Sequence, residues 1–139
     1  MSENNPSLDW PENFPRTPSS EREPYPHNFR VDTQDAFRNI LQELGRMDAT
    51  DLRIDSAAQH LSSNPNLPYK QSNPGDPGVV AYFRQEGRKF AVPCDRWISL
   101  RDNAQAIAKY LNAKRALDRY GVETVEDQTE MMTQLYEGD

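Results

Sequence analysis

The sequence is poor in reactive side chains, with one cysteine, Cys94, and two histidines, His27 and His60, among 139 residues. A lone cysteine cannot form a disulfide within the chain, which is consistent with a reducing compartment. One cysteine and two distant histidines also lack the paired spacings of structural zinc sites, so we expect no metal. A nucleophilic cysteine needs a base beside it, and both histidines fall in segments predicted to be irregular. We therefore expect Cys94 to pack at a strand end rather than to react.

Long apolar runs and glycine-rich loops are missing as well. No stretch approaches the roughly 20 apolar residues that a membrane span needs, and no N-terminal signal pattern precedes the first proline. The run NPGDPG (73–78) has only two glycines, and its prolines lack the amides that bind phosphate. We therefore expect a cytoplasmic protein with no cofactor and no membrane partner.

Charge is distributed unevenly along the chain, whose net charge is −6. Residues 1–26 carry five acidic and two basic residues, and residues 121–139 carry six acidic residues and no basic one. Residues 27–120 carry 14 basic and 11 acidic residues, so acidic ends flank a mildly basic centre. Such ends either serve solubility or screen a basic binding face.

Proline is abundant near the start, where six of the 11 prolines fall within the first 26 residues. Because proline disfavours helix in the residues before it, this segment is predicted to be an extended arm. Trp10 and Phe14 lie in the arm, and exposing two large rings to water is unfavourable. The rings either dock on the domain or present a motif to a partner. We divide the chain into an arm (1–28), an α+β domain (29–121) and an acidic tail (122–139).

The first helix and three strands follow from apolar periodicity. Apolar residues at helical spacing predict a helix over 33–47, capped by Asp32 or Thr33. Alternation of Leu52 and Ile54 with polar residues predicts a strand over 50–55. Residues 78–84 and 89–95 flank the run QEGR and predict a hairpin, in which Gly87 supplies a positive φ. Leu67 and Tyr69 are expected to hold the long connection at 56–77 against the core.

A second long helix is predicted to begin at Leu100 or Asp102, with Asp102 as its cap, and to stop at Gly121. Its inward face is expected to hold Ala104, Ile107, Ala108, Leu111 and Leu117, with Tyr110 and Tyr120 beside them. A short third helix is expected over 124–136, with an apolar patch of Met131, Met132 and Leu135. The order αβββα predicts an α+β fold with a three-stranded antiparallel sheet and two main helices on one face.

Several short motifs together resemble a known module: WPENFPRTP (10–18), LPY (67–69), DPGVVAYF (76–83), Gly87, PCDRW (93–97) and DNAQAI (102–107). The module is an uncharacterised one in bacterial, plasmid and phage proteins that are often named J-domain or DnaJ-like. The His-Pro-Asp tripeptide of a J domain does not occur in this sequence. The resemblance therefore implies an accessory module associated with mobile elements, without the J domain itself and without an activity to carry over.

Aspartates within these motifs have simple structural interpretations. We expect Asp76 to fix the turn before Gly78, and Asp95 to pair with an arginine or a backbone amide. The basic residues nearby have no such interpretation. Arg84, Arg88 and Lys89 lie at the hairpin tip, with Arg96 and Trp97 after it, and these five residues are our candidate binding surface.

Two functions remain open at this point. The first is a non-catalytic accessory or adaptor module that binds a protein partner, with Trp10 and Phe14 as a docking arm. The alternative is nucleic-acid binding through the hairpin tip, since αβββα is also the order of double-stranded RNA-binding domains. Against the alternative, the second helix begins without a lysine cluster, and the centre of the chain is only mildly basic. The sequence predicts neither a specific partner nor an oligomeric state.

Overall fold

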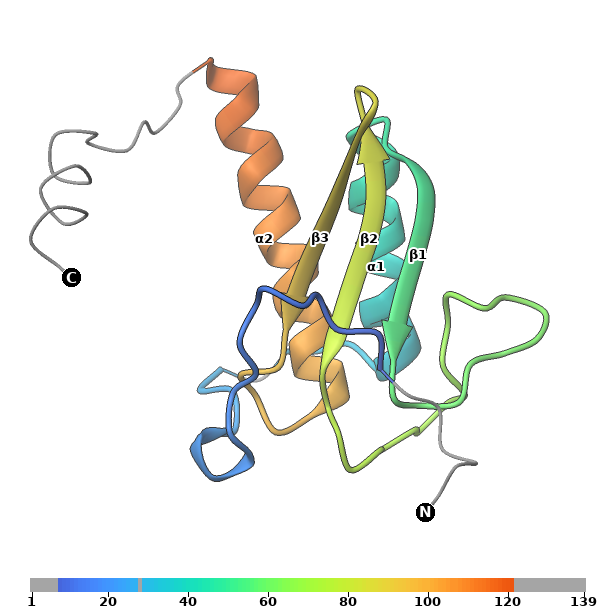
Figure 1. The fold of residues 1–139 in the computed structure, drawn as a ribbon, viewed down its shortest axis with the longest axis vertical. Coiled ribbons are helices and arrows are strands. Elements are labelled where there is room, and N and C mark those ends of the chain that lie inside the picture. Colours follow the sequence, from blue (N-terminus) through green and yellow to red (C-terminus); the bar gives the residue numbers. More distant parts are fainter. Residues whose placement is uncertain (1–7, 28, 122–139) are drawn as a thin grey trace, which may run out of the picture.

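The sheet and two helices are laid out in the order that the sequence predicts (Figure 1). The computed structural model describes residues 8–27 and 29–121, so the helix expected over 124–136 lies outside the described residues. The elements are the 3-10 turn η1 (Ser19–Glu21), α1 (Thr33–Arg46), β1 (Thr50–Ser56), β2 (Val79–Gln85), β3 (Arg88–Cys94) and α2 (Leu100–Tyr120). The strands form an antiparallel sheet in the order β1-β2-β3, which confirms the predicted α+β class.

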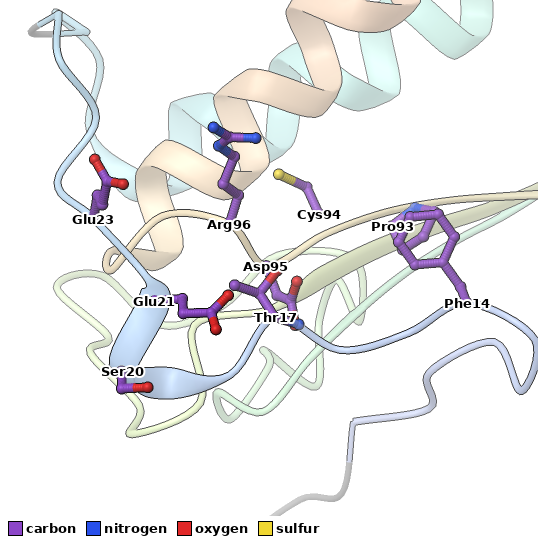
Figure 2. A pocket seen from close by; sticks show the side chains of 9 residues that line it. All are labelled: Phe14, Thr17, Ser20, Glu21, Glu23, Pro93, Cys94, Asp95 and Arg96. Carbon is purple, nitrogen blue, oxygen red and sulfur yellow. The ribbon is translucent and has the colours of Figure 1, made fainter.

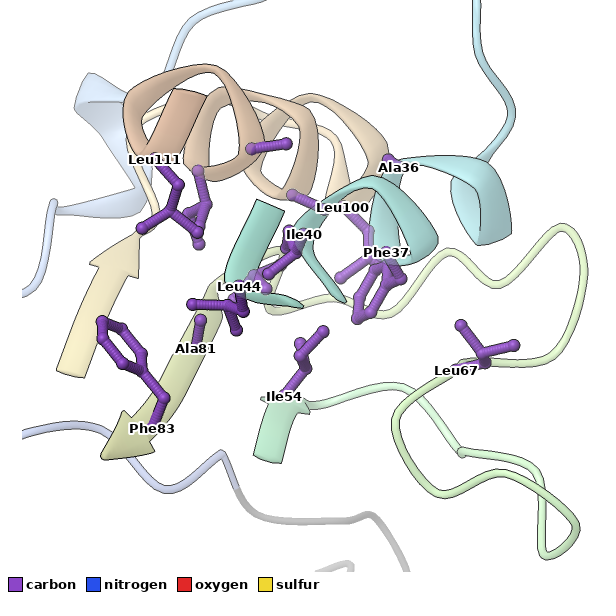
Figure 3. Packing of buried hydrophobic residues seen from close by; sticks show 14 of the residues in the cluster. Ala36, Phe37, Ile40, Leu44, Ile54, Leu67, Ala81, Phe83, Leu100 and Leu111 are labelled. Carbon is purple, nitrogen blue, oxygen red and sulfur yellow. The ribbon is translucent and has the colours of Figure 1, made fainter. Parts of the chain in front are cut away.

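The hydrophobic core lies between the two helices and one face of the sheet (Figure 3). Phe37, Ile40 and Leu44 recur at helical spacing on α1 and are fully buried, whereas Leu41 is partly buried. Strands β1 and β2 contribute alternate residues, and α2 contributes its first turns; these residues are Ile54, Val79, Ala81, Phe83, Leu100, Ala104, Ile107 and Leu111.

Helix α1 begins and ends as its local sequence directs. The Asp32 carboxylate accepts a hydrogen bond of 2.8 Å from the Asp35 amide, which confirms Asp32 as the N-cap. The helix ends at Arg46, one residue before the predicted end, and Met47 takes the C-cap position.

Helix α2 is capped by Ser99, and the prediction that Asp102 caps it was wrong. The Ser99 hydroxyl accepts a hydrogen bond of 3.1 Å from the Asp102 amide. Asp102 therefore lies inside the first turn, where its carboxylate contacts the guanidinium of Arg101 at 3.1 Å. Gly121, with φ of 74°, ends the helix in the left-handed conformation, as predicted.

The second half of α2 lies at the surface, and the prediction that Leu117 faces inward was wrong. Leu117 is 57% exposed, and Tyr110 and Tyr120 are also exposed. The reason is geometric: α2 has 21 residues and α1 only 14, so the last turns of α2 extend past its partner. In Figure 1 this end of α2 lies away from the sheet.

The hairpin turn has the geometry that its sequence requires. Gln85 pairs with Arg88, which leaves a two-residue turn of Glu86 and Gly87. Both turn residues have positive φ, 54° and 78°, as in the hairpin turns whose twist matches that of the strands. The predicted role of Gly87 is confirmed.

Strand β1 and the connection after it differ in part from the predicted pattern of buried side chains. A register shift between Thr50 and Arg53 places Asp51 at a φ of 53°, so Leu52 is only half-buried while Ile54 is buried. In the connection, Leu67 is buried as expected, but Tyr69 is 46% exposed. Backbone pairing holds this segment instead, with the Leu61 amide donating to Leu67 O at 2.9 Å.

The start of the described arm, drawn in dark blue, crosses the face of the sheet opposite the helices, whereas η1 lies beyond the end of β3 (Figure 1). The Asp9 amide donates to the Asp55 carboxylate at 2.7 Å, and the Tyr82 hydroxyl donates to the Asp9 carbonyl. Val80, in register with Asp55, is fully buried although it points away from the helices. The start of the arm therefore forms a third layer over the sheet. The Trp10 ring packs against Phe14 within the arm, and Phe14 is 47% exposed, so the choice between ring docking and partner binding stays open.

Candidate functional site

Asp95 lies at the centre of a charged cluster that fastens the arm to the end of β3. Its carboxylate accepts hydrogen bonds from Arg16 Nε at 2.7 Å and from the Thr17 amide at 3.0 Å. Arg22 approaches the same carboxylate at 3.4 Å and donates to the Asp95 carbonyl at 3.0 Å. Because the side chain of Asp95 is only 3% exposed, its charge is neutralised almost entirely by these partners. The predicted pairing of Asp95 is confirmed.

Arg16 joins Asp95 to a second carboxylate. Its guanidinium contacts the two oxygens of Asp76 at 2.6 and 3.1 Å, a bidentate arrangement. Asp76 in turn accepts the Gly78 amide at 3.1 Å, which confirms its role in the turn before β2. Hydrogen bonding to Asp76 raises the pKa of Arg16, so this arginine stays charged at any ordinary pH.

Both carboxyl groups ionise more readily than usual. Burial by itself raises the pKa of Asp76 and of Asp95, but the hydrogen bonds from Arg16 and from backbone amides more than offset it. Each pKa therefore lies below the ordinary value of 3.8.

We expect the arm to loosen in acid. A carboxylate with a lowered pKa in the folded state stabilises that state above its ordinary pKa, and the contribution is lost as the pH falls through the lowered value. The free energy of unfolding should thus fall with decreasing pH below 3.8, the ordinary value. Urea denaturation measured at several pH values checks this, and the Asp76→Asn variant should show a flatter acid decline. An equally steep decline in that variant would contradict the assignment.

Asn103 forms a second junction, at the first turns of α2. Its side chain is fully buried and donates to Pro77 O at 2.8 Å and to Trp97 O at 3.0 Å. Its carbonyl oxygen accepts the Trp97 amide at 2.9 Å and the Cys94 thiol at 3.3 Å. The motifs that carry the family resemblance, apart from LPY and Gly87, thus contact one another around Asp95 or Asn103. Their contacts there stabilise the fold.

The structure shows the surroundings of two potential nucleophiles, Cys94 and Ser56. Burial raises the pKa of the Cys94 thiol, so it is protonated at neutral pH and is a poor nucleophile. Ser56 lies 2.7 Å from His60 Nε2, a serine–histidine pair that the sequence did not reveal. Ser56 is only 1% exposed, and His60 Nδ1 donates to the Pro65 carbonyl at 2.6 Å. The pair therefore holds the long connection in place.

The structure divides the five residues of the predicted binding surface into two groups. Arg84, Arg88 and Lys89 lie at the hairpin tip, where Arg84 pairs with Asp51 at 3.2 Å. Arg96 and Trp97 lie beyond the opposite end of β3, which spans seven residues, so the groups are roughly 20 Å apart.

Trp97 is part of an aromatic cluster with the arm. Its ring packs edge-on against Tyr25 at 4.8 Å, and Tyr25 stacks on Phe29 at 4.2 Å. The Arg96 guanidinium lies over the Trp97 ring at 5.2 Å, and the Ile98 amide donates to Glu23 O at 3.0 Å. This cluster secures the second half of the arm.

A groove of about 380 Å³ runs between β3 and α2. Phe14 of the arm and Tyr110 of α2 both line it. The remaining lining is mostly apolar and comprises Ala91, Val92, Pro93, Cys94, Ala106 and Ile107. Phe14 and Tyr110 are about half exposed, at 47% and 53%, so two aromatic rings border an open apolar depression.

A second hollow, of about 710 Å³, continues from the first because both are lined by Phe14, Pro93 and Cys94. Figure 2 shows that the arm forms one wall, with Glu21 and Glu23, and that the chain leaving β3 forms the other, with Arg96. The two hollows together border β3 from its middle to its end. The first hollow is lined mostly by apolar side chains, and the second carries charged side chains.

Comparison with protein-family models, with curated proteins and with solved structures found no match to this chain. The resemblance to the J-domain-associated module therefore stays a prediction. Within residues 8–27 and 29–121, no group of three His, Cys, Asp or Glu side chains could hold a metal ion, and no helix could cross a membrane.

Sequence reasoning singled out Phe14 but missed the rest of the groove. Ala91, Ala106 and Tyr110 fit the apolar patterns of a strand and a helix, and nothing in those patterns distinguishes a groove residue from a core residue. The available signal was Phe14 itself, a large ring in a proline-rich segment.

Proposed function

We propose that the protein is a non-catalytic adaptor domain that binds an extended segment of a partner protein along the free edge of β3. The observation that carries the proposal is an apolar groove beside a strand that pairs, among the described residues, only with β2. Addition of a peptide strand to an open sheet edge is a common mode of recognition, in which backbone hydrogen bonds supply affinity and side-chain pockets supply specificity.

The backbone of β3 is suited to accept such a strand. Pro93 has no amide hydrogen, so it fits a strand only where that hydrogen would face away from the neighbouring strand. Ala91, two residues earlier, shares this orientation and presents its N–H and C=O to the free edge. Ala91 is also exposed and small, so an approaching backbone meets little obstruction.

The side chains around the groove indicate what kind of peptide would fit. An apolar side chain would occupy the depression that Phe14 and Tyr110 line. A basic side chain farther along the peptide would reach the hollow that carries Glu21 and Glu23, which form no ion pair with the described part of the chain. We therefore propose a partner segment in which an apolar residue is followed by lysine or arginine.

The chemistry of the charged groups supports a binding role. Asp76, Asp95, Arg16 and Arg22 neutralise one another, and the Cys94 thiol has a raised pKa. These four charged groups therefore hold the arm and the strand end together, and they satisfy one another's charges.

A peptide selection with a matched pair of variants tests the proposal. The full chain is panned against a displayed library of extended peptides, and the best binder is measured by fluorescence anisotropy. Tyr110→Ser removes an exposed ring beside the groove and should weaken binding at least tenfold. Tyr69→Ser removes a ring of similar exposure, 46%, that does not line the groove, and should leave binding unchanged.

Two results would contradict the proposal: failure to select any peptide, or equal losses in both variants. Binding to a nucleic-acid duplex that falls steeply with salt, and that is lost in an Arg88→Ser and Lys89→Ser double variant, would instead support the hairpin tip as the functional surface.

A further inference from the structure

The face of the sheet opposite the helices has a small hollow, of about 210 Å³, near the hairpin turn. Tyr82 and Arg84 alternate with the core residue Phe83, so they point to this face, and the described arm crosses it farther from the turn (Figure 1). The polar side chains that line the hollow are Asp51, Arg53, Tyr82, Arg84 and Lys89. None of its lining residues lines the groove of the proposed function, so the two surfaces can be tested separately. We call it the sheet hollow.

Arg84 and Lys89 place like charges at directly opposite positions of β2 and β3. Pro93 has no amide hydrogen, so it belongs to a cross-strand pair that exchanges no backbone hydrogen bonds. Lys89, four residues earlier, belongs to a pair of the same kind, in which the two side chains are closest. Like charges directly opposite each other destabilise a sheet. An anion between the two side chains would turn this repulsion into attraction.

Within the described residues, only one of these two cations has a countercharge. The Asp51 carboxylate lies 3.2 Å from Arg84 Nε. The terminal nitrogens of Arg84 donate no hydrogen bond to the described part of the chain, and the Lys89 ammonium forms neither a hydrogen bond nor an ion pair there. A guanidinium fork beside an ammonium is an arrangement with which proteins hold phosphate, the first by paired hydrogen bonds and the second as a point charge.

The backbone at Asp51 is strained in a way that serves this arrangement. The pairing of β1 with β2 shifts register between Thr50 and Arg53, and Asp51 has a φ of 53°, which is rare outside glycine. Bulges of this kind redirect a side chain, and strained backbone is concentrated at ligand sites. Here the carboxylate reaches Arg84 Nε, so it fixes the guanidinium at the hollow while leaving the terminal nitrogens available.

The charges around the sheet hollow favour a small anion over a polyanion. Arg53 is already paired with Asp9 at 2.7 Å, so two aspartates, Asp9 and Asp51, flank the hollow and would repel a chain of phosphates that crossed it. Arg88 points to the other face of the sheet, because successive strand residues alternate, and cannot add to the charge of Lys89. Nucleic-acid duplexes are bound by several cations that follow the backbone. The sheet hollow has room and charge for one group.

We propose that the sheet hollow binds a single phosphate group, free or as a monoester, between the guanidinium of Arg84 and the ammonium of Lys89. A phosphate monoester carries nearly two negative charges at neutral pH and three acceptor oxygens. It can therefore accept from donors on both strands at once. The site is independent of the proposed peptide groove, and either can exist without the other.

Titration of the full chain with inorganic phosphate at constant ionic strength, followed by NMR, tests the proposal. The amide signals of Arg84 and Lys89 should shift and saturate. Lys89→Ser should weaken binding about tenfold, the loss expected for one hydrogen bond between charged groups. Arg88→Ser removes the same charge from the other face and should leave the affinity unchanged. A parallel titration with phosphoserine identifies the source, since the tighter ligand of the two is the one that the site takes.

A second pair of variants gives a readout that a structural role alone would not produce. Asp51→Asn removes the competing anion, and asparagine tolerates the positive φ, so phosphate should bind severalfold more tightly. Asp48→Asn is the matched control, because Asp48 is exposed, has a φ of 59° and does not line the hollow. No saturable shift, equal losses in Lys89→Ser and Arg88→Ser, or weaker binding in Asp51→Asn would overturn the proposal. Duplex binding that depends equally on Arg88 and Lys89 would also overturn it, in favour of a nucleic-acid surface.

Discussion

Replacing Asp95 by asparagine is expected to lower the free energy of unfolding by about 3 kcal/mol, the range seen when one member of a buried ion pair is removed. Asn has nearly the same shape, so the loss is electrostatic. It leaves the guanidinium of Arg16, now 2.7 Å from a neutral group, and that of Arg22 without their shared countercharge. The Thr17 amide also loses its charged acceptor. Urea denaturation measures the change.

Asp9→Asn is the matched control, because it neutralises an aspartate of the same arm. Asp9 contacts Arg53 at 2.7 Å, but both side chains are more than half exposed. Surface ion pairs of this kind contribute at most about 1 kcal/mol. If the two substitutions have equal effects on unfolding, Asp95 is not the anchor of the arm.

Replacing Asn103 by alanine is expected to lower the free energy of unfolding by about 3 kcal/mol, because it leaves several buried polar groups unpaired. The Trp97 amide and the Pro77 carbonyl are each within 3 Å of the Asn103 amide group. Alanine favours helix more than asparagine does, so the loss cannot be attributed to helix propensity.

Asn112→Ala on the same helix provides the comparison. Asn112 is exposed and donates to Glu43 at 3.1 Å, so its replacement should change stability by less than about 1 kcal/mol. Hydrogen exchange adds a local measurement: the Trp97 amide should exchange faster in Asn103→Ala than in Asn112→Ala. Equal exchange at Trp97 in both variants would show that the Asn103 junction does not hold the segment after β3.

Most features governed by neighbouring residues were predictable from the sequence, although the cap of α2 was expected at Asp102 and is Ser99. The Asp32 cap, the positive φ at Gly87 and the stop at Gly121 each depend on a few adjacent positions, and all three are found in the structure. The apolar periods of the helices and strands were sufficient for the fold class, because each amphipathic element has to bury one face.

Features governed by distant residues were not predictable. Asp95 was expected to pair with some arginine, but the choice of Arg16, 79 residues earlier, depends on how the arm crosses the sheet. Leu117 continues the apolar period of α2 and was therefore expected to be buried. It is exposed because α2 is longer than α1, so α1 does not cover the last turns of α2. The groove required the relative placement of β3, α2 and Phe14, which no single segment encodes.

The three-layer arrangement has a consequence for biosynthesis. Arg16 is made long before Asp76 and Asp95, which lie 60 and 79 residues later, so the arm emerges from the ribosome without its anchors. Contacts of such long sequence separation also carry a large loop-closure cost and form late in folding. A nascent chain halted before Asp95 would expose Trp10, Phe14 and the uncovered face of the sheet together. The arm can therefore attach fully to the domain only after Asp95, directly after the hairpin, has been synthesised.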